Sequence, residues 1–290
     1  MHVLVTGSAG VVGQHVVTSL AEAGHRIRTL DRTAAKHPRA DDHFPADVRD
    51  AQAVRRAMQD IEAVAHLAAI PHDRAGQAED VLHVNVQGTV HILLAASEAG
   101  ARSVVFLSSV NALGSFGGHR PSTRLPIDDD YSPHPMTPYQ LSKRLAEEAC
   151  RCFTDRHGLA TVCLRPVMVA TEWYYRRRWR FAAADRAEWA RHDYWAYVDV
   201  RDVCDAVAKA LEVEGPAHIR ALLAANDTSL DVPTAELVDR FYADTPWNHV
   251  SREEYLRDQP YRSLVDCRAA RERLAWQPRH SWRSETAADD

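Results

Sequence analysis

Lysine is scarce in this chain. Only three lysines occur, Lys36, Lys143 and Lys209, while arginine is abundant. The 290 residues carry a formal net charge of −5, and no block of basic residues dominates any part of the sequence. Binding to nucleic acid, which needs concentrated positive charge, therefore has no support in the composition. Because lysine is so rare, a lysine inside a recognisable motif is a candidate functional residue.

Long apolar runs, metal-ligand clusters and paired cysteines are also missing. No apolar stretch reaches the roughly 18 residues of a membrane span. An expected first strand at His2 leaves no room for the charged region of a signal peptide. The cysteines are five, an odd number, and neither they nor the sixteen histidines show a zinc-binding spacing. We therefore expect a cytoplasmic protein with reduced thiols, no metal site and no membrane partner.

The first half of the chain alternates between short apolar runs and helical patterns. This rhythm predicts an α/β fold with a doubly wound parallel sheet of the Rossmann type, covered by helices on both faces. It weakens after about Val167, so we expect a main domain over residues 1–166 and a smaller C-terminal lobe over 167–290 that is interleaved with the sheet. We expect strands over residues 2–6, 26–30, 63–67, 103–108 and 161–165, and helices over 11–23, 51–58, 80–99, 137–157, 200–211, 233–242, 251–257 and 268–274.

A glycine-rich segment lies between the first expected strand and the first helix. Residues 6–13 read Thr-Gly-Ser-Ala-Gly-Val-Val-Gly. Gly7, Gly10 and Gly13 permit a tight turn and close approach of the backbone to a pyrophosphate, and the helix that starts at Val11 and Val12 offers backbone donors and a positive dipole end. Glycines alone also fit an ordinary tight turn. The strand–loop–helix context favours the interpretation as a dinucleotide site.

Asp31 ends the second expected strand, eighteen residues after Gly13. A carboxylate at this place accepts hydrogen bonds from the hydroxyls of the adenosine ribose and repels a 2′-phosphate. The position predicts NAD rather than NADP. Arg32 is the opposing signal, because a guanidinium beside the ribose tolerates that phosphate, and Asp31 also fits a simple turn cap.

Tyr139 and Lys143 are four residues apart in an expected helix and therefore share one face. An ammonium near a phenol favours the phenolate and is expected to lower the tyrosine's pKa. Such a tyrosine can exchange a proton with an alcohol during hydride transfer. Ser108 and Ser109 follow a buried strand, where a hydroxyl faces the crevice of a parallel sheet. Alone, the pair also fits a surface tyrosine and a solvated lysine.

Taken in order, these segments resemble the extended short-chain dehydrogenase/reductase family, which includes NAD-dependent sugar epimerases and dehydratases. The similarity is dense over residues 2–166 and weaker over residues 197–203 and 266–276. The matching segments are Thr6–Gly13, Asp31, Asp47-Val48, His66–Ala69, Asn85–Thr89, Ser108-Ser109, Tyr139–Lys143 and Arg165-Pro166.

The resemblance implies a role for each matching residue. Ser109, Tyr139 and Lys143 would be the catalytic trio, and Asn85 would support the active-site helix. The family also implies a homodimer formed through the helices over 79–99 and 137–157. Further contacts to NAD are implied for Asp47, Val48, Leu67, Ala68, Ala69, Asn85, Ser108, Tyr139, Lys143, Arg165 and Pro166.

The substrate half departs from the family pattern. No Asn follows Arg165-Pro166, no glycine-rich turn precedes Tyr194, and His192 stands where the family usually has an Arg. These elements usually hold a nucleotide diphosphate, so their loss favours a smaller substrate. The segment 173–180, rich in aromatics and arginines, fits either a clamp for an anionic ring or an amphipathic surface helix. Candidate substrate contacts are Asn111, Met168, Arg176 and His192.

We therefore expect an NAD-dependent enzyme that transfers hydride at a secondary alcohol of a small sugar-like substrate. Epimerisation and oxidation of a small sugar acid, as in the family's uronate dehydrogenases, both remain open. Dehydration is less favoured, because no Asp-Glu pair follows Ser109. A non-catalytic NAD-binding regulator is the alternative from another class.

Overall fold

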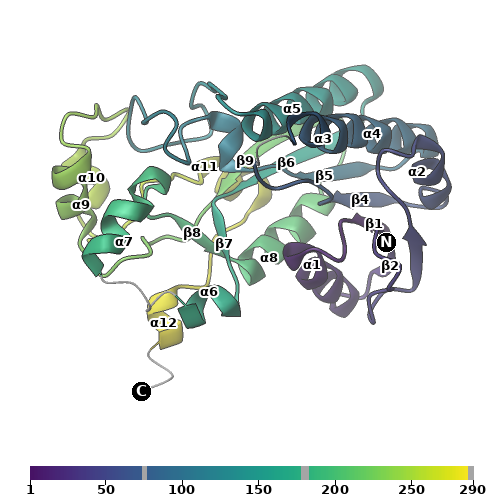
Figure 1. Cartoon of the computed structure of the whole chain (residues 1–290), viewed down its shortest axis with the longest axis horizontal. Coiled ribbons are helices and arrows are strands. Elements are labelled where there is room, and N and C mark those ends of the chain that lie inside the picture. The colour runs from purple at the N-terminus through teal and green to yellow at the C-terminus, as the bar shows by residue number, and fades with distance from the viewer. Residues whose placement is uncertain (74–76, 178–182, 287–290) are drawn as a thin grey trace.

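The computed structural model describes residues 1–73, 77–177 and 183–286. A seven-stranded sheet runs through the centre, in the order β3-β2-β1-β4-β5-β6-β9, with every pair parallel (Figure 1). A second, two-stranded parallel sheet joins β7 (Met168–Ala170) to β8 (Tyr197–Asp199). The strands of the main sheet are β1 (His2–Thr6), β2 (Arg26–Asp31), β3 (Asp42–Pro45), β4 (Ala63–His66), β5 (Ser103–Leu107), β6 (Ala160–Pro166) and β9 (His218–Leu223).

Helices cover both faces of this sheet. On one face α1 (Val11–Glu22) packs beside α8 (Val200–Leu211), and the other face carries α2 (Ala51–Ala57), α4 (Gly88–Ala99) and α5 (Pro138–His157). In β1, Val3 and Val5 join the first core and Leu4 joins the second, because successive side chains of a strand point to opposite faces. The predicted doubly wound Rossmann architecture is confirmed.

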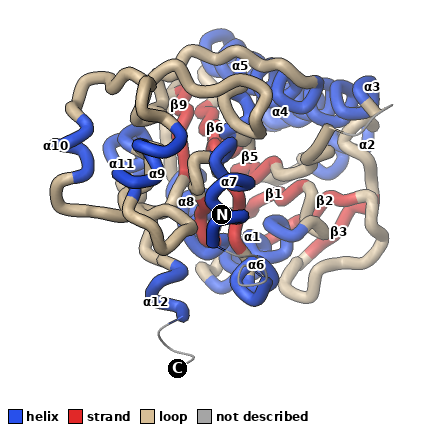
Figure 2. Tube along the Cα trace, turned by 60° about the vertical axis from the view of Figure 1, so that its left-hand side comes forward, coloured by secondary structure: helices blue, strands red, loops and turns tan. Residues whose placement is uncertain are grey.

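The C-terminal part contributes to the same sheet. β9 pairs with β6, and α8 packs on the sheet, so the sequence boundary at Pro166 does not separate two bodies in space. Figures 1 and 2 place α9, α10 and α11 on the β9 side of the sheet, and Figure 1 shows α12 next to α6, against which it packs. The remaining elements are α3 (Ala78–Leu82), η1 (His83–Gln87), η2 (Val110–Leu113), α6 (Glu172–Arg177), α7 (Ala183–Ala190), η4 (Arg191–Asp193), α9 (Thr234–Phe241), α10 (Arg252–Leu256), α11 (Arg268–Leu274) and α12 (Trp282–Thr286).

The helix expected over residues 80–99 is interrupted. η1 is a π-helical turn in which the Gly88 N–H donates to the His83 carbonyl, five residues earlier. The turn carries Asn85, and it is followed by a glycine for a steric reason: a Cβ on Gly88 would lie 2.6 Å from Cγ2 of Val48. Single π-turns inside helices occur frequently at functional sites.

The predicted ends of α5 are confirmed. Thr137 caps the N-terminus by accepting from the Gln140 N–H, Pro138 occupies the first turn, and Gly158 closes the helix in the left-handed conformation. Tyr139 lies in the first turn of this helix, next to Pro138.

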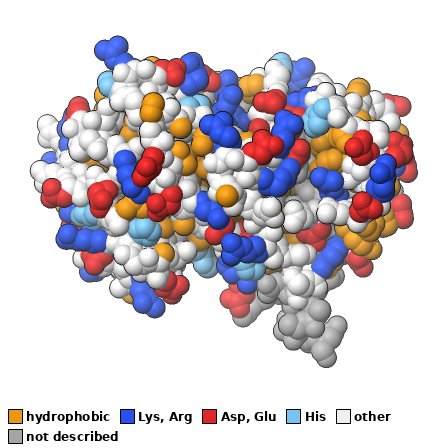
Figure 3. Space-filling view, turned by 180° about the vertical axis from the view of Figure 1, so that it is seen from behind, with side chains coloured by type: hydrophobic (Ala, Val, Ile, Leu, Met, Phe, Trp, Pro, Cys, Tyr) orange, Lys and Arg blue, Asp and Glu red, His pale blue; other side chains and the backbone are white. Residues whose placement is uncertain are grey.

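No helix among the described residues is long and apolar enough to cross a membrane, and those residues contain no group of side chains suited to a metal ion. All five cysteines are free thiols. Figure 3 shows acidic and basic side chains interspersed over one face of the molecule, without a continuous area of one sign.

Candidate active site

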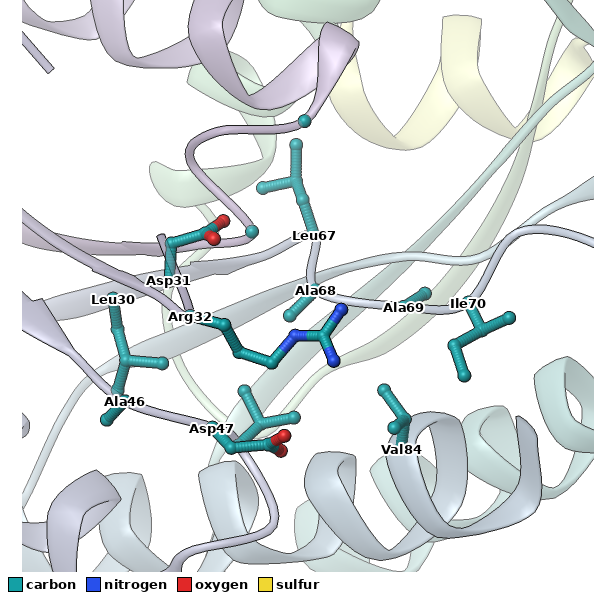
Figure 4. A pocket seen from close by; sticks show the side chains of 13 residues that line it. Leu30, Asp31, Arg32, Ala46, Asp47, Leu67, Ala68, Ala69, Ile70 and Val84 are labelled. Atoms are coloured by element: carbon teal, nitrogen blue, oxygen red, sulfur yellow. The ribbon is translucent and has the colours of Figure 1, made fainter. Parts of the chain in front are cut away.

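A pocket opens at the carboxyl ends of β1, β2 and β4, where the strand order reverses between β1 and β4. This is the place where open α/β sheets bind ligands. Its cavity volume is about 160 Å³ (Figure 4). The lining residues are Gly7, Gly10, Leu30, Asp31, Arg32, Ala46, Asp47, Val48, Leu67, Ala68, Ala69, Ile70 and Val84.

The tight turn of the glycine loop requires residues without a Cβ at Gly7 and Gly13. Gly7 has a φ of +70°, and a Cβ there would lie 2.6 Å from the Ala68 nitrogen. A Cβ on Gly13 would lie 2.1 Å from the Gly7 carbonyl oxygen. Val11 is exposed and Val12 is half-buried, so at these positions the backbone of the first turn of α1, rather than the side chains, is available to a phosphate. The loop therefore fits a dinucleotide.

Asp31 links the end of β2 to the glycine loop. Its carboxylate accepts hydrogen bonds from the Ala9 N–H at 3.0 Å and from the Thr33 N–H at 2.9 Å. Figure 4 shows the Arg32 guanidinium extending across the pocket, between the segment from Leu67 to Ile70 and Asp47.

Asp47 has a basic partner of its own. Arg49 donates to both carboxylate oxygens, and with a smaller contribution from Arg32 it lowers the pKa of Asp47. The carboxylate is therefore ionised where the adenine end of the cofactor is expected.

Asp31→Ala should narrow the preference for NAD over NADP. The substitution removes the carboxylate that accepts hydrogen bonds from the ribose hydroxyls of NAD and repels the 2′-phosphate of NADP. Calorimetric titration of both cofactors measures this. Asp31→Asn separates charge from shape, since it removes the charge and retains one oxygen for the loop. Equal affinities of the wild-type protein for the two cofactors would contradict the assignment and point to Arg32 as a phosphate ligand.

The three predicted catalytic residues come together beside this pocket. The Ser109 hydroxyl lies near enough to the Tyr139 phenol to lower its pKa. The same hydroxyl oxygen accepts from the Asn111 backbone at 3.2 Å and from its side-chain amide at 3.3 Å. Lys143 is buried, lies 5.9 Å from the centre of the Tyr139 ring, and donates to the Leu107 carbonyl at 2.8 Å.

The pKa of Tyr139 is raised in this structure, not lowered as the spacing to Lys143 predicted. Burial raises the pKa of Tyr139, the Asp73 carboxylate raises it further, and only the Ser109 hydroxyl opposes them. Burial also lowers the pKa of Lys143 to about 8, against the attraction of Glu147. Loss of hydration on burial therefore shifts the pKa values of Tyr139 and Lys143 more than the pairing that their spacing suggested.

Asp73 is a site residue that the sequence analysis missed. Its carboxylate accepts from the Thr137 hydroxyl at 2.5 Å and from the Tyr139 N–H at 2.7 Å. It therefore holds the first turn of α5 from a segment 64 residues earlier in the chain. The sequence offers no signal for this contact, because it depends on how the loop after β4 packs against the start of α5.

Ser108 and Arg165 do not present their side chains to a cofactor, contrary to expectation. The Ser108 hydroxyl donates to Glu147 at 2.7 Å. Arg165 is buried and donates to both oxygens of Glu147, at 2.8 and 2.6 Å. Adjacent residues at a strand end point in opposite directions, so Ser109 faces Tyr139 while Ser108 faces the core. Pro166 is buried at the end of β6.

Asn85 and Val84 lie between the pocket and α5. The Asn85 side chain bonds the backbone of Ile70 and donates to the Ser142 hydroxyl at 2.9 Å, so its amide supports α5 and is not directed at a cofactor. Val84, which we expected at the dimer face, lines the cofactor pocket.

The candidate substrate residues are spread over the second half of the site. Met168 is exposed at the start of β7, and His192 lines a second cavity of about 240 Å³. The side chain of Arg176 lies outside the described part of the structure, as do those of Arg177, Arg178 and Arg180. The second cavity is lined by Ser115, Gly118, Arg120, Pro121, Arg191, His192, Tyr194, Phe241 and Tyr242.

Two aromatic residues before these arginines have structural partners. Tyr175 donates to Asp199 at 2.8 Å, and Tyr174 and Tyr175 pack against the small core around Tyr197 and Trp282. Trp173 is 62% exposed. The tyrosines therefore match the amphipathic-helix interpretation of this segment.

Comparison with known proteins assigns the family. The model of the NAD-dependent epimerase/dehydratase family matches residues 3–220, three quarters of the chain. The chain belongs to this family. The resemblance to extended short-chain dehydrogenases/reductases is thereby confirmed, and NAD is the cofactor.

Individual relatives cover less of the chain. The NAD-dependent glucose-6-phosphate dehydrogenase of Haloferax volcanii is 33% identical over 180 residues, which are 56% of this chain and 66% of that protein. The uronate dehydrogenase of Pseudomonas syringae pv. tomato is 31% identical over 166 residues, 56% of this chain and 57% of that protein. This chain thus matches less than two thirds of either relative's length.

A solved structure shows the same fold over the whole chain. It is a short-chain dehydrogenase/reductase superfamily protein from Agrobacterium tumefaciens with bound NAD. Its TM-score is 0.73 at 24% identity, and the match covers 100% of this chain and 96% of that one.

Proposed function

We propose that this protein transfers hydride between NAD and a secondary alcohol of a small sugar-like substrate, with Tyr139 as the acid/base. The observation that carries the proposal is the meeting of three groups: the Ser109 hydroxyl is near enough to the Tyr139 phenol to influence its pKa, and the buried Lys143 ammonium lies 5.9 Å from the centre of the same ring. A phenol and a hydroxyl paired in this way can hold one substrate oxygen between them.

The chain's own residues would act in a defined order. Ser109 and Tyr139 bind the alcohol oxygen. Tyr139 removes the hydroxyl proton while the carbon that bears this hydroxyl gives up a hydride. Bound NAD supplies the acceptor for that hydride. To accept this proton Tyr139 must be the phenolate, a form that burial opposes by raising its pKa and that the Lys143 ammonium, 5.9 Å from the ring centre, stabilises.

We propose a small anionic sugar, in particular a sugar acid, as the substrate. Both curated relatives described above are named for free anionic sugars rather than nucleotide sugars. The second cavity combines Arg120, Arg191 and His192 with the aromatic walls of Phe241 and Tyr242. Guanidinium groups bind a carboxylate through paired hydrogen bonds, and aromatic faces accommodate a ring.

A substrate panel tests this proposal. Free uronates, aldoses and sugar phosphates are compared with UDP- and dTDP-sugars by absorbance of NADH and by mass spectrometry of the product. We expect a free sugar acid to be oxidised with release of NADH, and Arg120→Ala or His192→Ala to raise its KM more than they lower kcat. Efficient turnover of a nucleotide sugar alone would contradict the small-substrate assignment.

The same panel distinguishes net oxidation from epimerisation. A redox-neutral reaction returns the hydride to the substrate, so an isomeric product would form without accumulation of NADH. The family description includes epimerases, which makes this the second candidate. NAD that stays bound through purification would favour it, because the cofactor then need not leave between turnovers.

We also propose a homodimer formed through α5. Leu141 and Leu145 lie one turn apart on this helix and are 40% and 42% exposed, while Leu94 on α4 is half-buried. Light scattering should give twice the mass of the chain at micromolar concentration. Leu145→Glu should shift the mass to the monomer, because it places a charge in the apolar interface. A wild-type monomer would contradict this arrangement.

A further inference from the structure

A chain of buried polar groups starts at the cofactor pocket. The Ala68 N–H donates to the Thr6 hydroxyl at 3.2 Å, and that hydroxyl lies 2.7 Å from Nδ1 of His66. Nε2 of His66 lies 3.0 Å from the Thr89 hydroxyl, which donates to the Asn85 carbonyl at 2.6 Å. Thr6, His66 and Thr89 are each fully buried.

The side chain of Asn85 continues this path to the catalytic helix. It accepts from the Ile70 N–H at 2.8 Å and donates to the Ile70 carbonyl at 3.0 Å, so it holds the pocket segment directly. It also donates to the Ser142 hydroxyl at 2.9 Å. Ser142 in turn donates to the backbone carbonyl of Tyr139 at 2.7 Å. The path thus ends on the residue proposed as acid/base.

The ends of the path determine the direction of every bond in it. The Ala68 N–H can only donate, so the single hydroxyl proton of Thr6 is left for Nδ1 of His66. The Asn85 carbonyl can only accept, so Thr89 gives it the hydroxyl proton and must itself accept from Nε2. All groups are satisfied only when His66 is neutral with its proton on Nε2. Burial supports the neutral form by lowering the pKa of His66 to about 3.

We propose that His66 and Thr89 are positioning residues that hold the first turn of α5, and with it Tyr139, in register with the Ala68–Ile70 segment of the NAD pocket. Contacts made by NAD at this segment are thereby transmitted to the catalytic helix. The π-helical turn η1 serves this arrangement, because it carries Asn85 four residues before Thr89 on α4. The inference rests on the proposed role of Tyr139, but its test needs no substrate.

Hydrogen–deuterium exchange with and without NAD tests the link. In the wild-type protein, NAD should slow exchange both in residues 67–70 and in the first turns of α5. Thr89→Val removes the hydroxyl and leaves Nε2 of His66 without an acceptor. We expect the variant to bind NAD and to protect 67–70, but to exchange about tenfold faster at 139–143, the ratio that corresponds to one lost hydrogen bond. Thr89→Ser should restore the wild-type pattern.

Thr154→Val is a matched control on the same helix. Thr154 is buried and belongs to a similar cluster, in which its hydroxyl lies 2.7 Å from that of Thr161, and the Thr161 hydroxyl lies 2.9 Å from Nδ1 of His218. This variant loses a comparable buried hydrogen bond and should leave exchange at 139–143 unchanged. Equal effects of the two valine variants at 139–143 would reduce the role of Thr89 to general stability and overturn the proposal.

The tautomer of His66 gives a second test, which is measured on the wild-type protein and uses a variant only to assign the resonance. Nitrogen-15 NMR of histidine-labelled wild-type protein, with His66 assigned by His66→Asn, should show a neutral ring protonated on Nε2 throughout the folded pH range. A ring protonated on Nδ1, or one that titrates with an ordinary histidine pKa, would overturn the proposal.

Discussion

Tyr139→Phe should reduce turnover by about 10²–10⁴-fold, the usual contribution of a positioned acid/base group. The substitution removes only the phenolic oxygen, which lies near Ser109 and is proposed to exchange the proton with the substrate. The ring, its packing and the backbone bond to Asp73 remain. NAD affinity and the free energy of unfolding should therefore stay close to the wild-type values.

Tyr255→Phe is the matched control for this loss. Tyr255 is also buried, and its hydroxyl donates to the Ser263 carbonyl at 2.8 Å, in the C-terminal part of the chain. It should lower stability slightly and leave turnover unchanged. A Tyr139→Phe enzyme that retained most of its rate on the true substrate would remove Tyr139 from the mechanism.

Glu147→Gln should lower the free energy of unfolding by about 3–5 kcal/mol, the cost of leaving one partner of a buried ion pair uncompensated. Glu147 is buried and accepts two hydrogen bonds from the Arg165 guanidinium and one from Ser108. The guanidinium of Arg165 stays charged at every practical pH, and within the described part of the chain its ion pair is with Glu147.

Glu148→Gln provides the comparison, since it removes a carboxylate from the next position of the same helix. Glu148 pairs with Arg144 at 2.7 Å and Arg151 at 3.0 Å near the surface, where such pairs contribute about 0–1 kcal/mol. Urea denaturation measures both losses. Equal free energies of unfolding in the two variants would show that the buried Arg165–Glu147 pair contributes no more to stability than a surface pair.

Glu147 also bears on the site itself. Its charge is the main influence that keeps the pKa of Lys143 from falling below about 8, so its removal should lower that pKa further. Loss of the Lys143 charge would weaken the support for the Tyr139 phenolate. Turnover of Glu147→Gln should therefore fall even under conditions in which the variant is folded.

The regular elements were largely predictable because their signals are local. The strand over residues 2–6 and the helix from Pro138 to Gly158 are marked by β-branched runs, an N-cap threonine and a closing glycine. The π-turn at His83–Gln87 has no such local signal in the sequence. β9 was missed because it follows a stretch where the alternation of strand and helix is lost.

For the site, spacing located the residues but not their surroundings. The four-residue spacing identified Tyr139 and Lys143. The position directly after a buried strand identified Ser108 and Ser109. Which serine faces Tyr139 depends on Glu147 of α5, which binds the Ser108 hydroxyl and is 39 residues from it in the chain. The raised pKa of Tyr139 depends on burial by segments distant in sequence. The hydrogen bonds from α5 to Asp73 depend on how the loop after β4 packs against this helix.

Reduction of enzyme-bound NAD in a single turnover tests the central claim most directly. It registers hydride transfer whether the hydride is released as NADH or returned to the substrate. Excess protein loaded with NAD is mixed with each sugar of the panel, and the absorbance and fluorescence of NADH are followed. The account predicts rapid reduction by a small sugar acid in the wild-type protein, and at most a trace at the same NAD occupancy in Tyr139→Phe. Equally rapid reduction in both proteins, or none with any sugar despite tight NAD binding, would contradict it, and the second result would favour a protein that only binds NAD.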